Sequence, residues 1–279
     1  MKTSTKIFIA KFISNFIRFL IKSFGKNIKK IVTKRNQIFF SLDLTEGIDF
    51  AIFLNLYEKK VLNFYSKIVK PNFTIIDIGS NIGFHTLNFA KLCSKGKVYS
   101  IEPTFFAFSK LKHNISLNTD LKKIIIFEQI FFSRLRINKK KEKVYASWPL
   151  IKTKKKTHPV LMGQEKGISN AKVECLDKYI LRKKINNVDM IKIDVDGNEY
   201  DVLKSGTKTI INFKPIIMIE FCPYLHKDKD LDYLLKFFNK LNYKFINSSN
   251  SQVLELKCIE DLKQNIGYGS SENFFLISE

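Results

Sequence analysis

Cysteine and arginine are both scarce in this chain of 279 residues. The four cysteines form no Cys-x-x-Cys pair and have no His at metal-ligand spacing, so we expect free thiols, buried in a protein of a reducing compartment. Arg supplies only 5 of the 48 basic residues, yet Arg is the residue best suited to bidentate contacts with phosphates and bases. The net charge of +22 is therefore weak evidence for nucleic-acid recognition. Either it is a solvated Lys-rich surface, or part of it meets an anionic partner such as a membrane, a nucleotide or a polysaccharide.

Long uninterrupted apolar runs are also missing. Residues 7–22 are largely apolar but include Lys11, Arg18 and Lys22, whereas a membrane-spanning helix needs about 20 mostly uncharged residues. No apolar run leads into a small-residue cleavage site, so we expect a cytoplasmic protein. Residues 5–24 fit a basic amphipathic helix. This helix either rests on the inner face of a membrane or packs on the main domain or a partner subunit.

Hydrophobic residues make up 45% of the chain, which excludes a disordered protein and supports one main domain. Residues 1–70 are predicted to form a helical extension, with helices near 5–24 and 49–69 joined by a Lys-rich connection at 26–36. This extension carries no obvious chemistry. Residues 71–279 are predicted to form the main domain.

The main domain has the pattern of an α/β protein, in which short apolar runs alternate with amphipathic stretches. Such a pattern predicts a mostly parallel, Rossmann-like sheet of seven strands with helices on both faces. The predicted strands are Thr74–Ile78, Lys97–Ile101, Lys123–Phe127, Asp189–Ile193, Pro215–Phe221, Lys244–Asn247 and Asn273–Ile277. The predicted helices are Gly83–Cys93, Phe105–Leu117, Glu199–Ile210 and Asp230–Leu241. Residues 133–170, rich in Lys, Thr, Gly and Pro, are predicted to be either a loop-rich insertion on the substrate side or a disordered excursion.

A glycine turn after the first predicted strand is the candidate cofactor site, because ligands of such sheets bind at the carboxyl ends of the strands. Gly79 removes a side chain where the backbone turns, and Gly83 permits close approach to a ligand or to the strand. Asp77 can accept a hydrogen bond from a cationic or amino group, and Asn81 can bridge backbone and ligand. The glycines are four residues apart and residue 81 is Asn, which departs from the dinucleotide fingerprint G-x-G-x-x-G. The spacing favours an unphosphorylated nucleoside such as S-adenosylmethionine over NAD.

Glu102, at the end of the second predicted strand, follows this turn by about 20 residues. A carboxylate in that place can accept hydrogen bonds from both ribose hydroxyls of a nucleoside. The alternative is an ordinary solvent-facing strand end. Together, the turn and the acid are a stronger indication of a nucleoside site than either is alone.

The chain here resembles the FkbM family of methyltransferases over roughly residues 70 to 278. The matching motifs are D-I-G-S-N-I-G-F-H-T at 77–86, I-E-P at 101–103, L-D-K-Y-I at 176–180, I-K-I-D-V-D-G-N-E at 191–199 and K-P-I-I-M-I-E at 214–220. The resemblance implies the class I S-adenosylmethionine-dependent methyltransferase fold. It also implies that the methionine and adenosine parts of the cofactor are lined by Asp77, Gly79, Asn81 and Gly83, with Glu102 on the ribose.

Two further residues of the first motif, Ser80 and Thr86, are included among the predicted cofactor-binding residues. Ser80 stands where the family often has Ala. Residues 128–133 lack the Ala-rich turn usual in the family, and we expect Glu128 or Gln129 to face the adenine base.

Lys192, Asp194 and Asp196 are the candidate catalytic residues. Alternation along the predicted strand puts all three on one side, near the cofactor turn. Methyl transfer to an alcohol requires an acceptor held in line and a group that removes its proton. We expect Asp194 or Asp196 to be the general base or the orienting group, with Lys192 as electrostatic partner. The family usually has Glu in place of Asp196, so a shorter side chain must reach the acceptor directly or through water.

Two alternatives for this segment stay open. In one, Lys192 and Asp194 form a buried structural pair and Glu199 caps the next helix. In the other, Asp194, Asp196 and Glu199 hold a divalent metal. The sequence matches no dedicated calcium loop, however, and our first expectation is that the site holds no metal.

Three other residues are weaker candidates. Glu220 ends a predicted strand at the same sheet edge and is a candidate for binding the acceptor. His85 and His226 are further candidates, although a lone His near a strand end is more often structural.

The resemblance implies an O-methyltransferase that acts on hydroxyl groups of sugars, glycans or secondary metabolites, for example in cell-surface polysaccharide biosynthesis. One alternative is a nucleic-acid methyltransferase, which the positive charge alone supports. This chain lacks the N/D-P-P-Y/F tetrapeptide of enzymes that methylate base amino groups. A second alternative is a non-catalytic binding module that keeps the cofactor fold and acts at a membrane surface.

Overall fold

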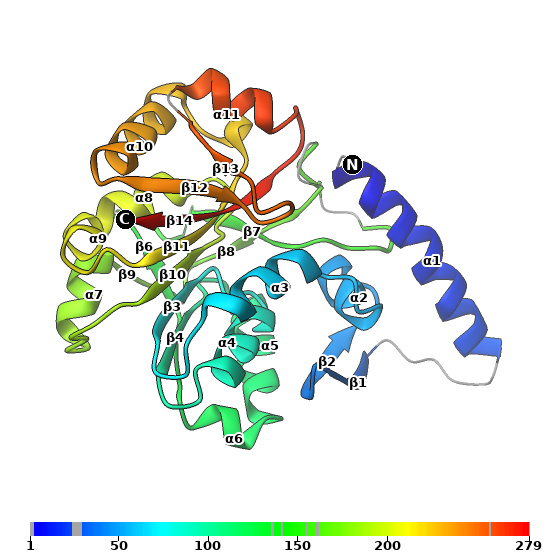
Figure 1. Cartoon of the computed structure of the whole chain (residues 1–279). Coiled ribbons are helices and arrows are strands. Elements are labelled where there is room, and N and C mark those ends of the chain that lie inside the picture. Colours follow the sequence, from blue (N-terminus) through cyan, green and yellow to red (C-terminus); the bar gives the residue numbers. More distant parts are fainter. Residues whose placement is uncertain are drawn as a thin grey trace.

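Figure 1 shows the computed structural model, in which a twisted sheet lies between two layers of helices. The structure describes residues 3–23, 30–134, 137–140, 142–153, 156–159, 162–256 and 258–278. The four cysteines are free thiols, of which Cys93 and Cys222 are buried and Cys175 and Cys258 are half-buried.

Among the residues that the structure describes, eight strands form the central sheet. In order across the sheet they are β13 (Val253–Leu254), β12 (Tyr243–Asn247), β14 (Glu272–Ser278), β11 (Ile216–Phe221), β10 (Met190–Ile193), β3 (Thr74–Ile78), β4 (Lys97–Ile101) and β5 (Ile125–Glu128). The five strands from β11 to β5 are parallel, and β14, β12 and β13 add an antiparallel edge. The predicted α/β fold with a mostly parallel sheet is therefore confirmed, with β13 as an eighth strand that the sequence did not predict.

Helices cover both faces of the sheet because its central strands are apolar on both sides. In β3, Ile75 packs with the helices of one layer and Ile76 with those of the other. The first layer contains α3 (Lys59–Ile68), α4 (Phe84–Leu92), α5 (Phe105–Ser116) and α6 (Thr119–Lys122). The second contains α7 (Leu176–Arg182), α8 (Glu199–Ser205), α9 (Thr207–Phe213), α10 (Asp228–Lys240) and α11 (Ile259–Asn265), with the short 3-10 helix η1 (Pro223–Leu225) before α10.

The single helix predicted over 199–210 is wrong, because the chain forms α8 and α9 with Gly206 between them. A Cβ at Gly206 would lie 2.5 Å from a methyl group of Leu176. The break therefore allows the junction of the two helices to pack closely on α7.

The first 70 residues contain more than helices. They form α1 (Thr3–Ser23), the antiparallel hairpin of β1 (Lys30–Arg35) and β2 (Ile38–Asp43), α2 (Gly47–Phe53) and α3. The helix predicted near 5–24 is confirmed as α1. The helix predicted over 49–69 is wrong, because α2 ends at Phe53 and Asn55 and Glu58 then adopt left-handed conformations. The connection predicted over 26–36 is also wrong from residue 30 onward, where β1 begins.

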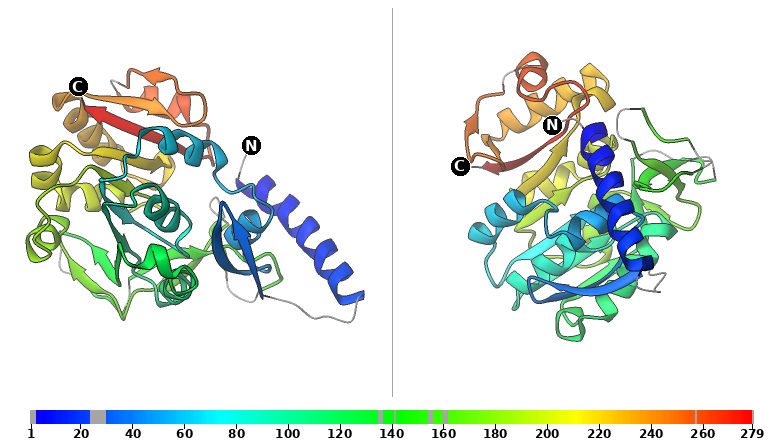
Figure 2. Two further views of the ribbon diagram at one scale, coloured as in Figure 1. Left: turned by 60° about the horizontal axis from the view of Figure 1, so that its bottom comes forward. Right: turned by 90° about the vertical axis from the view of Figure 1, so that its right-hand side faces the viewer.

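The hairpin belongs to the hydrophobic core of the domain. Ile38, Phe40 and Leu42 alternate along β2 and are buried against the first helical layer. Figure 2 shows the hairpin and α1 beside the sheet layers. None of the helices that the structure describes is long and apolar enough to cross a lipid bilayer.

Two small sheets lie beyond the carboxyl edge of the central sheet. The strand β6 (Ile130–Phe132) pairs with β9 (Lys172–Glu174), and β7 (Lys143–Ser147) pairs with β8 (Gln164–Gly167). Where the structure describes the predicted loop-rich insertion, it therefore contains a β-ribbon. The backbone of this segment meets α2, since Gly47 N–H donates a 2.7 Å hydrogen bond to the carbonyl of Trp148.

Phe40→Ala tests whether the hairpin is part of the core. We expect the free energy of unfolding to fall by about 3–5 kcal/mol, because the substitution leaves a cavity where a fully buried ring had packed. The neighbouring Phe39 is 42% exposed, so Phe39→Ala is the matched control and should have a much smaller effect. Denaturant unfolding measures both, and equal losses would contradict the prediction.

Candidate active site

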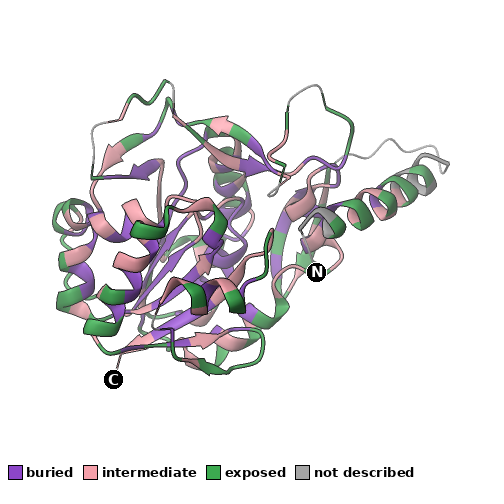
Figure 3. Cartoon of the chain, turned by 90° about the horizontal axis from the view of Figure 1, so that it is seen from above, coloured by how far each residue is buried: buried purple, intermediate pink, exposed green. Residues whose placement is uncertain are grey.

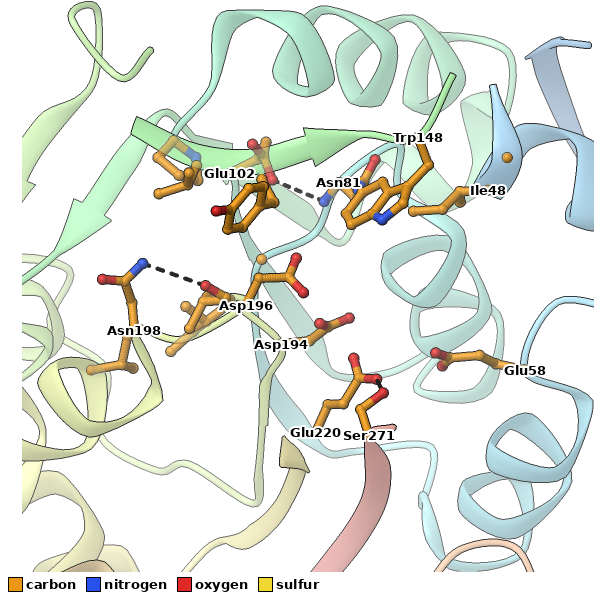
Figure 4. A pocket seen from close by; sticks show the side chains of 18 of the residues that line it. Ile48, Glu58, Asn81, Glu102, Trp148, Asp194, Asp196, Asn198, Glu220 and Ser271 are labelled. Atoms are coloured by element: carbon orange, nitrogen blue, oxygen red, sulfur yellow. Dashed lines mark hydrogen bonds between the residues drawn. The ribbon is translucent and has the colours of Figure 1, made fainter. Parts of the chain in front are cut away.

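A pocket of about 310 Å³ opens at the carboxyl ends of the central strands. It is lined by the loops that follow β3, β4 and β10, by the end of β11, and by residues of α1, α2 and the β7 ribbon. Figure 4 shows that its polar side chains come from several of these elements and point into a common space. This is the edge of an α/β sheet at which ligands bind.

The loop after β3 forms part of the pocket wall, with Gly79 and Asn81 in the lining. Gly79 has a φ of +78°, and a Cβ there would lie 1.8 Å from the backbone oxygen of Asp194. Glycine is required at this position because the loop touches the chain that leaves β10. The predicted turn therefore brings the candidate cofactor loop against the candidate catalytic segment.

Glu102 closes β4 and also lines the pocket, although it is almost fully buried. Its Oε2 accepts a 3.0 Å hydrogen bond from Asn81 N–H, and its Oε1 accepts bonds of 2.9 and 2.7 Å from the N–H and hydroxyl of Thr104. Burial raises the pKa of Glu102, while these bonds and the charge of Lys192 oppose the increase. The structure thus ties the predicted ribose acid directly to the predicted loop.

Four of the predicted cofactor residues lie next to this loop but outside the pocket lining. Thr86 donates a 2.6 Å hydrogen bond to Asp77 Oδ2, and the hydroxyl of Ser80 donates to the carbonyl of Asp77 at 2.8 Å. A Cβ at Gly83 would lie 2.7 Å from a methyl group of Leu111, so this glycine permits close packing on α5. In the structure, these four residues support the loop rather than line the pocket. Their direct contact with a cofactor stays a prediction.

Lys192 is buried between the carboxylates of β3 and of the segment after β10. Its Nζ lies 3.3 Å from Asp77 Oδ1 and 3.4 Å from Asp194 Oδ2, and it donates a 3.1 Å hydrogen bond to the carbonyl of Gly79. Burial alone would lower the pKa of Lys192, but the two carboxylates outweigh it and the pKa is raised. Lys192 and Asp194 thus form, next to the loop, the ion pair that the structural alternative predicted. A catalytic role for either residue stays a prediction.

The carboxyl groups of the pocket have opposite pKa shifts. Burial would raise the pKa of Asp194, but Lys192 and other neighbours lower it overall. The pKa values of Asp196 and Glu220 are instead raised well above their ordinary values, first by burial and then by Asp194 and other acids. Ser271 donates a hydrogen bond to Glu220. Asp194 is thus held ionised while its two neighbours retain protons more strongly.

Two further lining residues, Tyr57 and Glu58, come from the connection between α2 and α3. Glu58 Oε2 lies 2.8 Å from His85 Nε2, whose Nδ1 lies 3.2 Å from the hydroxyl of Tyr65. The sequence interpretation missed Tyr57 and Glu58 because they lie outside any motif, in a stretch for which it predicted no chemistry. His85 is buried in this network and supports the wall that carries Glu58.

Three other sequence candidates lie outside the lining. Glu199 accepts backbone hydrogen bonds from Val195 and Gly197 and pairs with His226 at 2.8 Å. In the part of the chain that the structure describes, no group of three or more His, Cys, Asp or Glu residues is arranged to hold a metal ion. Glu128 pairs with cationic side chains of α7, and its predicted contact with adenine has no counterpart in the pocket lining.

The mostly parallel sheet with a pocket at its carboxyl edge is the Rossmann-like fold of the class I methyltransferases, whose cofactor is S-adenosylmethionine. Residues 77–245 match the family model of the methyltransferase FkbM domain. The chain therefore belongs to the FkbM methyltransferase family, as the sequence motifs predicted.

Solved structures with the same general fold are distant from this chain. The FkbM methyltransferase of Methylobacillus flagellatus has 16% identity and a TM-score of 0.45; the match covers 78% of this chain and 52% of that one, so this chain spans about half its length. TYW2 of M. jannaschii in complex with AdoMet has 12% identity and a TM-score of 0.45, with 89% and 84% covered. Precorrin-6y C5,15-methyltransferase of Geobacter metallireducens has 7% identity and a TM-score of 0.43, with 80% and 90% covered. No curated protein matches the sequence.

Glu102→Ala tests the cofactor side of the pocket. We expect binding of S-adenosylmethionine to weaken by about 1–3 kcal/mol, because a buried acceptor of the ribose is lost. Calorimetry measures the Kd, and thermal unfolding checks that the variant folds.

Glu128→Ala is the control, because Glu128 lies outside the pocket lining and pairs with α7. It should leave the Kd unchanged. A normal Kd for Glu102→Ala, or a large loss for Glu128→Ala, would contradict this assignment.

Proposed function

We propose that this protein transfers the methyl group of S-adenosylmethionine to a hydroxyl group of a sugar, a glycan or a secondary metabolite. One observation carries the proposal: Asp194, Asp196 and Glu220 share a single pocket with the loop after β3 and with Glu102. Groups that can bind and remove a hydroxyl proton therefore lie in the same cavity as the residues suited to the cofactor.

The pocket residues fit S-adenosylmethionine. An ionised carboxylate has about four acceptor positions, and hydrogen bonds from Asn81 and Thr104 occupy three of those of Glu102. The remaining position, on Oε2, suits one ribose hydroxyl. Pro103 and the β6 strand supply apolar surface for the adenine ring, and the nearby carboxylates suit a cationic ligand.

When bound, S-adenosylmethionine supplies a methyl group on a positively charged sulfur, which is a good leaving group. The protein must then orient the acceptor and take up its proton. We assign proton removal to Asp196, whose raised pKa makes its ionised form a stronger base than an ordinary Asp. Asp194, kept ionised by Lys192, accepts a hydrogen bond from a neighbouring hydroxyl of the acceptor and so orients it.

The acceptor side of the pocket is formed by elements outside the cofactor loops. Tyr145 and Trp148 line it from the β7 ribbon, and Ile48, Tyr57 and Glu58 line it from α2 and the following connection. Aromatic side chains and carboxylates that line one pocket suit a hydroxylated cyclic acceptor. The aromatic side chains can contact the apolar face of the acceptor, and the carboxylates can accept hydrogen bonds from its hydroxyls. Glu220, which lines the same pocket as Asp194, is proposed to bind a further hydroxyl.

A methyl-transfer screen tests the proposed activity. The wild-type protein with isotopically labelled S-adenosylmethionine should methylate one or more members of a panel of nucleotide sugars, glycans and hydroxylated metabolites. RNA and DNA in the same panel provide the comparison. Transfer to nucleic acid alone would contradict the proposed acceptor class. A cytoplasmic location and a role in polysaccharide synthesis stay predictions from the sequence.

Asp196→Asn tests the proposed base. We expect kcat to fall by about 10²–10⁴-fold with little change in cofactor Kd, because general-base catalysis is lost while the cofactor residues stay in place. In the wild type, Asp196 must be deprotonated to act, so kcat/KM should rise with pH through its raised pKa, above the ordinary value of 3.8. The variant should lose this rise.

Asp201→Asn is the matched control, because Asp201 on α8 also has a raised pKa but lies outside the pocket lining. It should leave both kcat and the pH profile unchanged. Full activity of Asp196→Asn would exclude Asp196 as the base. If Asp194→Asn alone removed the rise with pH, the base would be Asp194.

A further inference from the structure

Helix α1 has one face that packs on the rest of the protein. Ile7, Ile13 and Ile17 contact a small core that includes Phe50 of α2. The buried hydroxyl of Ser14 donates a 2.8 Å hydrogen bond to the carbonyl of Leu44. The helix is therefore fixed in orientation, and its opposite face is held outward.

The outward face carries a line of phenylalanines. Phe8, Phe12 and Phe16 are 73%, 73% and 57% exposed, and their spacing of four residues places them in one row along the helix. Ile9, beside this row, is 43% exposed. Figure 3 shows α1 projecting from the side of the molecule, with exposed residues along its length. Adjacent exposed rings of this kind indicate an interaction surface.

The charge of the N-terminal sequence restricts the partner. Residues 1–42 contain ten Lys and Arg residues and no Asp or Glu. Two copies of so basic a segment would repel each other, which disfavours self-association through α1. A helix with an apolar row and a basic sequence instead complements an anionic lipid surface, because the headgroups attract the cations and the interface accepts the rings.

We propose that α1 binds the surface of an anionic lipid bilayer, with Phe8, Phe12 and Phe16 inserted at the headgroup level. The same helix contributes Ile7 and Ala10 to the lining of the pocket. Membrane binding therefore brings one wall of the active site to the lipid surface, where an acceptor attached to a lipid is within reach. The binding itself does not depend on the proposed methyl transfer.

Vesicle co-sedimentation of the full chain tests this proposal. The wild type should sediment with vesicles of mixed phosphatidylglycerol and phosphatidylcholine. It should bind vesicles of phosphatidylcholine alone much more weakly, and added salt should weaken its binding to the mixed vesicles. The double variant Phe12→Gln and Phe16→Gln should bind the mixed vesicles at least about tenfold more weakly, because two inserted rings are lost.

The control is Leu181→Gln, which removes an equally exposed apolar side chain from α7, where Leu181 is 78% exposed. It should bind like the wild type. Circular dichroism and S-adenosylmethionine calorimetry should show that both variants keep the fold and the cofactor site, since the substituted side chains are exposed.

Three results would overturn the proposal. The first is wild-type protein that binds neither kind of vesicle. The second is a double variant that binds anionic vesicles as tightly as the wild type, which would assign the binding to Lys residues elsewhere. The third is a dimer in sedimentation equilibrium that the double variant converts to a monomer, which would make the row of rings a contact between two copies.

Discussion

The buried ammonium group of Lys192 holds the active site together. Its three N–H donors face three acceptors, which belong to Asp77 in β3, to the carbonyl of Gly79 and to Asp194 after β10. Lys192 and Asp77 are register partners in adjacent parallel strands, so the sheet itself brings the charges together. A buried cation is tolerated because two carboxylates lie within 3.4 Å of it and a carbonyl accepts a hydrogen bond from it. The loop that is suited to the cofactor and the segment that carries the proposed base are thereby fixed relative to each other.

The position of Lys192 also influences which acids of the pocket are ionised. Asp194 is ionised because it lies against Lys192, whereas Asp196 and Glu220 face Asp194 and have raised pKa values. Carboxyl groups whose environments shift their pKa values in opposite directions can divide orientation and proton transfer between them. The excess of acidic groups also suits a donor that carries a sulfonium and an ammonium.

The features that could be predicted from the sequence are those that depend on residues close together in the chain. The runs of β3 and β4 are apolar and end in Gly79 and Glu102, so their place at the sheet edge followed from the α/β pattern. The pairing of Lys192 with Asp194 followed from alternation along one strand.

The position of Glu58 could not be predicted, because it depends on how α2 and α3 pack across the sheet edge. The hairpin was missed because the consecutive apolar residues of β2 obscure its alternation. The break at Gly206 was missed because it depends on contact with α7, far away in the sequence.

The residues that match the family begin at Asp77, after the connection that carries Tyr57 and Glu58. Part of the pocket wall therefore comes from outside the matched segment, and Glu58 of this part contacts His85 of the matched segment. A change at Tyr57 or Glu58 can alter this wall of the pocket while the contact between Lys192 and the loop after β3 stays in place. An isolated 77–245 fragment would keep Asn81, Glu102 and Asp194 but would lack the part of the pocket wall that α1, α2 and the following connection supply.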